Sequence, residues 1–219
     1  MSGLVYRLNR LHDLVLSFRS LDFVAPLLLR LFLAPVMIVA GYTKLETFDG
    51  TAAWLGDSLG LPFPTLMAAL VVAAELGGGL LLLLGLATRY VAVPLMFTMV
   101  VAACTVHWDN GWHAIAPSSA EHNSARVFAS IGVPAAGESL KNSIEVKERL
   151  DRARTILRQH GNYSWLTEKG GFVILQNGIE FAATYFLMLL VLFFTGGGRL
   201  LSLDYWIKER FRDIQDDDQ

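Results

Sequence analysis

Four apolar runs dominate the pattern of hydrophobic and polar positions along this chain. They cover about residues 24–44, 62–86, 90–108 and 173–195. Each is close to the roughly 20 apolar residues that a helix needs to cross the hydrocarbon core of a bilayer. The tryptophans lie at the end of a run or outside the runs, as in the aromatic belts of membrane proteins: Trp54, Trp108, Trp112, Trp165 and Trp206. The pattern predicts an all-α fold, an integral membrane four-helix bundle formed by residues 1–219 as a single membrane domain.

Two amphipathic helices are predicted outside the four runs. In residues 1–22, apolar side chains recur every three or four positions among three arginines, which indicates a helix lying in the membrane interface. Residues 138–160 carry an apolar face among charges of both signs. This second helix belongs to a long loop, 109–172, whose remaining part is irregular. It could lie on the membrane surface, cap the bundle, or only cover apolar surface.

Basic residues near the ends of the runs predict the orientation, because cytoplasmic flanks are enriched in Lys and Arg. Lys44 is the only basic residue from the end of the first run to the start of the second run. The opposite flanks are richer in basic residues: Arg7, Arg10, Arg19, Arg89, Arg199, Lys208, Arg210 and Arg212. We therefore expect both termini, including the tail 196–219, to be cytoplasmic and the loop 109–172 to face outward. The expected location is a bacterial cytoplasmic (inner) membrane.

The overall composition agrees with a lipid bilayer as the environment. Hydrophobic residues make up 53% of the chain and charged residues 17%, whereas soluble domains have about 25% charged residues. A net charge of −2 gives no general attraction to nucleic acid. The single cysteine, Cys104, excludes an internal disulfide and a CxxC pair. The chain has neither a GxGxxG motif nor a P-loop, so nucleotide binding has no support.

Charged residues inside the apolar runs mark a candidate functional site. Glu75 and Glu180 are the only charged residues of the second and fourth runs. A charge in hydrocarbon costs about 2.5–3.5 kcal/mol on insertion scales, and it usually faces a partner inside a bundle. From the rise of about 1.5 Å per residue, we expect Arg30 to pair with Glu75 in one polar layer. A second layer would contain Lys44, His107, Asn177 and Glu180.

These layers predict a polar pocket inside the bundle. It could hold a quinone head group, relay protons or bind a small polar substrate; alternatively, the charges only hold the helices together. Reduction of a quinone requires two protons, which a Glu, a His and a Lys could deliver.

Histidines and an aspartate near the end of the third run are candidate metal ligands. His107, Asp109 and His113 lie close together in sequence, and His122 follows. Imidazole and carboxylate suit zinc, copper or iron. Their spacing matches no standard ligand pattern, so no metal site is predicted and hydrogen-bonded interfacial histidines are favoured.

An ordered set of residues resembles the DoxX family of small four-helix membrane proteins. The set comprises Arg30, Gly41–Leu45, Leu61–Pro62, Glu75–Gly78, Gly85, Thr88–Arg89, His107, Gly196–Arg199 and Ser202–Asp204. It covers roughly 24–108 and 173–206 and leaves out the loop 109–172. The resemblance implies an association with thiosulfate:quinone oxidoreduction, quinol oxidase complexes or oxidative-stress assemblies. It also implies that the functional residues are Arg30, Lys44, Glu75, Arg89 and His107.

Three hypotheses for function follow. The first is a redox-linked subunit that binds a quinone and relays protons, as the membrane subunit of a quinone-linked oxidoreductase. The second is a non-catalytic assembly subunit that binds a protein partner in a membrane redox complex. The third is a small-solute transporter, for which a homo-oligomer could be needed.

Overall fold

The computed structural model describes residue 10 and residues 18–217 of the chain. Among these residues there is no β-strand, only one isolated antiparallel bridge between Ile115 and Leu175. The prediction of an all-α fold is confirmed. Most of the predicted interfacial helix over 1–22 lies outside the described residues, and Phe18–Leu21 form a short 3-10 helix, η1.

Three helical segments of the described chain are long and apolar enough to cross a membrane. They are Val24–Glu46 (α2), Pro64–Leu84 and Thr88–Asn110. These segments agree with the first three predicted runs to within a few residues. A shorter linking region between the first two contains α3 (Phe48–Ala53) and the π-helix η2 (Trp54–Ser58).

The second and third segments are each interrupted by a π-helical turn. The second consists of α4 (Pro64–Val72), η3 (Ala73–Gly77) and α5 (Gly78–Leu84). The third consists of α6 (Thr88–Ala102), η4 (Ala103–His107) and the 3-10 turn η5 (Trp108–Asn110). Glu75 lies on η3 and His107 on η4. Such π-bulges are rare and occur frequently at functional sites.

The fourth predicted run is helical only in its second part. The helix α10 is Glu180–Thr195, 16 residues, or about 24 Å at the standard rise, against about 30 Å of hydrocarbon. Before it, the chain pairs with an earlier segment through Ala116 N–H to the Ile174 carbonyl (2.9 Å). A Cβ on Gly178 would lie 2.5 Å from the Gly111 carbonyl oxygen, so this approach requires a glycine. The prediction of a helix beginning at residue 173 is wrong, because the residues before Glu180 pair with this earlier segment instead of forming a helix.

The chain divides into two compact units: Met1–Val100 with Thr184–Gln219, and Val101–Ala183. The core of the first unit is built from four apolar helices. It contains Leu33, Ala34, Met37, Leu82, Val91, Ala92, Leu95, Met99, Leu189 and Leu192. This unit ends in a further helix, α11 (Leu203–Asp217), where the sequence analysis had placed a tail.

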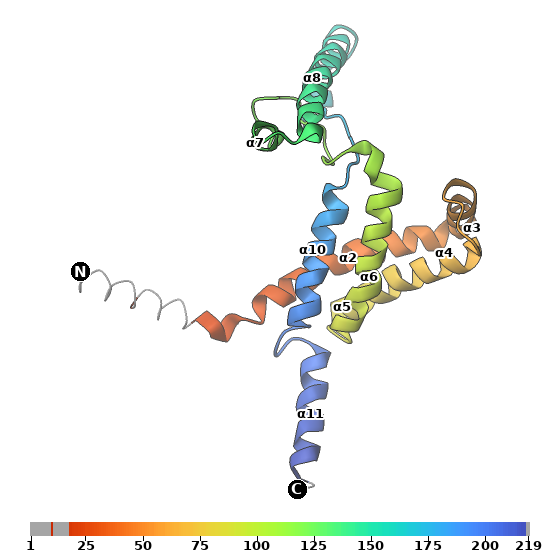
Figure 1. Ribbon diagram of the computed structural model, residues 1–219, viewed down its shortest axis with the longest axis vertical. Helices are drawn as coiled ribbons and strands as arrows, with labels where there is room; N and C mark the ends of the chain where they lie inside the picture. Colours follow the sequence, from red (N-terminus) through yellow and green to blue (C-terminus); the bar gives the residue numbers. More distant parts are fainter. Residues whose placement is uncertain (1–9, 11–17, 218–219) are drawn as a thin grey trace. The chain divides into compact units, whose positions relative to one another are not determined.

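Glycines bring α2 into direct backbone contact with the second apolar segment, which runs beside it in Figure 1. A Cβ on Gly41 would lie 2.4 Å from the Leu76 backbone nitrogen. A Cβ on Gly79 would lie 2.9 Å from the backbone nitrogen of Ile38. Small residues at membrane helix interfaces allow this close approach. The two helices are therefore held at a separation that only glycine permits.

The second unit contains α7 (Ala125–Ser130), α8 (Pro134–His160) and α9 (Tyr163–Leu166). The helix predicted over 138–160 is confirmed but begins earlier, with Pro134 in its first turn, where a missing N–H costs nothing. The short helix α7 was not predicted. The outer face of α8 carries exposed ion pairs one turn apart, such as Arg152 with Glu148 at 2.6 Å.

Candidate functional site

The buried carboxylate of Glu75 is paired with Lys44. The Lys44 Nζ lies 2.5 Å from Glu75 Oε2 and donates a hydrogen bond to it. The Glu75 side chain is 6% exposed, while the Lys44 side chain is 33% exposed. Lys44 is on the last turn of α2, one turn after Gly41, and Glu75 is on η3. The glycine contact thus places an acid and a base from two helices within hydrogen-bond distance.

The predicted pairing of Arg30 with Glu75 is wrong. The buried guanidinium of Arg30 donates to four backbone carbonyls, those of Leu82 (2.8 Å), Leu83 (3.1 Å), Gly197 (2.5 Å) and Leu201 (3.1 Å). The first two carbonyls belong to the last turn of α5, where the helix dipole favours a cation. Seven residues, or about 10 Å of helix, separate that turn from Glu75. Arg30 therefore binds at another level of the bundle.

Gly85 makes room for the Arg30 side chain. It ends α5 in the left-handed conformation, with φ 65°, as is usual for glycine just after a helix. A Cβ at this position would lie 2.5 Å from the Arg30 Cζ. Both the backbone conformation and the space thus require glycine here.

Asp204, at the start of α11, is a candidate site residue that sequence reasoning did not single out. Its carboxylate accepts hydrogen bonds from the backbone N–H groups of Ala87 (2.6 Å) and Thr88 (2.9 Å). A carboxylate at a helix N-terminus is favoured by the unpaired N–H groups and the helix dipole, and α6 begins at Thr88. The available signal was Asp204 in the Ser-Leu-Asp sequence that the DoxX resemblance includes.

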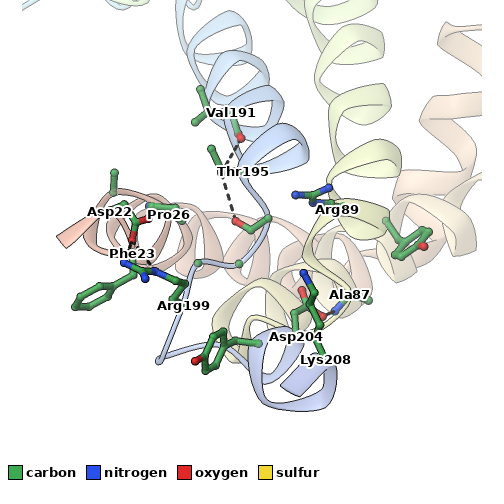
Figure 2. Close-up of a pocket in the computed structure, with 16 residues that line it drawn as sticks. Asp22, Phe23, Pro26, Ala87, Arg89, Val191, Thr195, Arg199, Asp204 and Lys208 are labelled. Atoms are coloured by element: carbon green, nitrogen blue, oxygen red, sulfur yellow. Dashed lines mark hydrogen bonds and ion pairs between the residues drawn. The ribbon is translucent and has the colours of Figure 1, made fainter. Parts of the chain in front are cut away.

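Arg89 is exposed and lines a cavity of about 660 Å³ in the first unit (Figure 2). The cavity lies beside the turn that ends α10, where a Cβ on Gly196 would be 3.2 Å from the Arg89 Nε. This cavity is separate from the Lys44–Glu75 pair, since neither residue lines it.

The second unit contains the other residues of the predicted second layer. His107 Nδ1 lies 2.8 Å from the Asn177 carbonyl oxygen, which also accepts from Asn110 Nδ2 (3.2 Å). The Glu180 carboxylate accepts from the Ala114 N–H (2.9 Å) and begins α10 rather than lying within a longer helix. Hydrogen bonds therefore connect His107 with Asn177, and Glu180 with Ala114. Lys44, the fourth residue of the predicted second layer, forms its ion pair with Glu75.

The candidate metal ligands make separate hydrogen bonds. His113 Nε2 lies 3.2 Å from Asn123 Oδ1, and His122 Nδ1 lies 3.0 Å from Ser119 Oγ. Asp109 lines a second cavity, within Val101–Ala183. Within residues 18–217, no three His, Cys, Asp or Glu side chains form a group that could hold a metal ion.

Apolar helices of spanning length and a buried ion pair define a helical integral membrane protein. The DoxX family model matches residues 25–108. "Inner membrane protein YphA" of Escherichia coli (strain K12) is 35% identical over 109 residues, which cover 47% of this chain and 77% of YphA. "Putative oxidoreductase CatD" of Bacillus subtilis (strain 168) is 40% identical over 83 residues, 38% of this chain and 60% of CatD. This chain belongs to the DoxX family. No solved structure matches it.

The family match has a clear limit along the chain. It includes Arg30, Lys44, Glu75, Arg89 and His107, and it ends at residue 108. Most of the second unit, including α7 and α8, lies beyond it. The Lys44–Glu75 pair is therefore within the matched region, whereas Asn177 and Glu180 are not.

Proposed function

We propose that this protein is a redox-linked membrane subunit that binds a quinone head group beside Lys44 and exchanges protons with it. One observation carries the proposal: a carboxylate buried in an apolar segment is joined to a lysine that is one-third exposed. An intramembrane ionisable residue indicates function by default. The pair also lies at a π-helical turn, a feature frequent at functional sites.

The pair has the chemistry that reduction of a quinone needs. A quinone becomes a quinol by taking up two electrons and two protons, one proton on each carbonyl oxygen. A partner dehydrogenase would supply both electrons. The Lys44 ammonium would donate a hydrogen bond to one oxygen, stabilise the charge that develops there, and transfer one proton. Glu75 holds the Lys44 amine in place through their hydrogen bond. Water at the exposed side of Lys44 would return the proton that Lys44 gives up, and water would also supply the second proton.

His107 is a second proton-transfer candidate. A carbonyl oxygen can only accept, so its bond with Asn177 requires the proton of a neutral His107 imidazole to be on Nδ1. Nε2 then carries the lone pair and could accept a proton. Asn177 would act by setting this tautomer, and Glu180 by holding the start of α10.

Binding of a quinone analogue to the full chain in nanodiscs tests the proposal. We expect saturable binding to the wild type. Glu75→Gln should weaken this binding by about tenfold, because it removes the charge-assisted hydrogen bond that holds Lys44. Glu148→Gln is the matched control, because it removes the carboxylate of an exposed ion pair. Absence of binding to the wild type, or equal binding by Glu75→Gln and wild type, would contradict the proposal.

A non-catalytic assembly subunit is the second candidate. It is favoured by the compact second unit, which extends mostly beyond the family match and presents the charged helix α8. A stoichiometric protein partner that copurifies equally with wild type and Glu75→Gln, without quinone binding, would support this function.

Solute transport and homo-oligomerisation stay predictions. Flux into liposomes would test the first, and mass measurement in detergent would test the second. The cytoplasmic position of both termini is likewise proposed from the basic flanks.

A further inference from the structure

The cavity beside Arg89 combines apolar walls with a concentration of charge. It lies in the first unit, between the beginnings of α2 and α6, the end of α10 and the start of α11 (Figure 2). Phe23, Pro26 and Val191 contribute apolar surface. The charged residues that line it are Asp22, Arg89, Arg199, Asp204 and Lys208. Three cations and two carboxylates thus share a space of about 660 Å³.

Both carboxylates of the cavity are already engaged. Asp22 Oδ1 accepts from Arg199 at 2.7 and 2.9 Å. Asp204 accepts from the two backbone N–H groups at the start of α6. By contrast, within the described part of the chain neither the Arg89 side chain nor the Lys208 side chain makes a hydrogen bond or an ion pair. The cavity therefore has two cations that can bind an anion without breaking an existing contact.

The helix α11 indicates the depth of this cavity relative to the bilayer. Its apolar residues recur at helical spacing and are exposed: Leu203, Trp206, Ile207 and Phe211. Asp204 and Lys208, one turn apart, lie on another face and line the cavity. An amphipathic helix of this kind lies in the membrane interface with its apolar face toward the acyl chains, and tryptophan favours the head-group level. The same helix then holds Lys208 at the level of the lipid phosphates.

We propose that this cavity binds the phosphate group of an anionic phospholipid through Arg89 and Lys208. A guanidinium can donate two parallel hydrogen bonds to phosphate oxygens, and an ammonium adds a point charge. Basic pockets between membrane helices bind lipid head groups in this way. The apolar wall of Phe23 and Val191 would contact the upper part of an acyl chain. The site shares no residue with the Lys44–Glu75 pair and does not depend on the proposed quinone chemistry.

Native mass spectrometry of the full chain in detergent tests this assignment. Phosphatidylglycerol and phosphatidylcholine are titrated separately, and inorganic phosphate is added in a third arm. We expect wild type to retain phosphatidylglycerol in preference to phosphatidylcholine. Arg89→Gln and Lys208→Gln should each lower that preference about fivefold, because this is the contribution of one basic residue near a membrane surface. Arg210→Gln is the matched control, because Arg210 is exposed on α11 but does not line the cavity.

Each outcome decides the proposal. A preference lost in Arg89→Gln and Lys208→Gln but kept in Arg210→Gln supports it, provided that the helical circular dichroism of all three variants equals that of wild type. Equal losses in all three variants would mean general surface attraction and would overturn the site. Saturable binding of inorganic phosphate without preference between the lipids would also overturn it, because the anion would then come from solution.

Discussion

Lys44 and Glu75 are 31 positions apart in sequence, yet their side chains are joined by a 2.5 Å contact between Nζ and Oε2. The contact lies next to the point where the backbones of α2 and η3 touch, at Gly41 and Leu76. The two partners differ in access to water, because the lysine is one-third exposed and the glutamate is covered. This difference leads to an asymmetric prediction.

Lys44→Ala should destabilise the protein more than Glu75→Gln. Removal of Lys44 leaves a carboxylate unpaired in the interior, which costs about 3–5 kcal/mol for a fully buried pair. Removal of the Glu75 charge leaves a lysine that can still reach water, so we expect about 1–2 kcal/mol. The measurement is chemical unfolding in detergent micelles. Equal effects, or a larger effect for Glu75→Gln, would contradict the structure.

Arg30→Lys should destabilise the first unit although the charge is kept. Arg30 donates to four carbonyls with three nitrogen atoms, and an ammonium cannot reproduce this planar fork. We expect a loss of about 2–4 kcal/mol, from two or more charge-assisted hydrogen bonds, in the same unfolding measurement. Arg149→Lys, on an exposed ion pair of α8, is the control and should change stability little.

Gly79→Ala and Gly77→Ala should have opposite effects. A Cβ on Gly79 would overlap the backbone of Ile38, and such overpacking costs about 1–3 kcal/mol. No atom lies within 4 Å of a Cβ on Gly77, so alanine there should stabilise the helix by about 0.5–1 kcal/mol. Apparent melting temperatures in detergent check the signs. A stabilised Gly79→Ala would show that α2 and α5 are further apart than described.

Asp204→Asn should weaken the start of α6. The substitution removes the negative charge that two backbone N–H groups share, and a capping carboxylate contributes about 1 kcal/mol. Hydrogen exchange of the Ala87 and Thr88 amides, measured by mass spectrometry, should become faster. Asp151→Asn, in an exposed pair with Arg154, serves as the control and should leave these amides unchanged.

Gly178→Ala should disrupt the second unit. A Cβ at this position would lie 2.5–2.7 Å from atoms of Gly111, Trp112 and His113, so the segment 111–116 would have to separate from 174–180. Limited proteolysis should then cut this region faster than in wild type. In Gly171→Ala the new Cβ meets no atom within 4 Å, and its cleavage pattern should equal that of wild type.

Hydropathy alone was sufficient to predict the three long helical segments. An uninterrupted apolar sequence of about 20 residues is long enough to cross a bilayer, and a helix satisfies all of its backbone hydrogen bonds there. It failed at the fourth run because residues 173–179 are paired with a distant segment rather than helical. Apolar character indicates burial or lipid contact, but it does not distinguish a helix from an extended segment. The requirement for glycine at position 178 arises from a contact 67 residues away, at Gly111.

The sequence also indicated Glu75 and Lys44 as candidate site residues, but it did not predict that they pair with each other. Helical rise gives a depth along one axis, whereas pairing depends on where two helices touch and how far a side chain reaches. Arg30 was assigned to Glu75 because buried charges need partners, and backbone carbonyls at the end of α5 were not considered. Asp204 was missed because its partners, Ala87 and Thr88, are more than 110 positions away.

The carbonyls that Arg30 binds are synthesised at different times. Two of them, Gly197 and Leu201, follow Arg30 by 167 and 171 residues, so they leave the ribosome long after α2 has been made. Until then the guanidinium lacks half of its acceptors in an apolar environment. A chain truncated before Gly197 would keep this deficit, because two of the four carbonyls that accept from Arg30 would be absent.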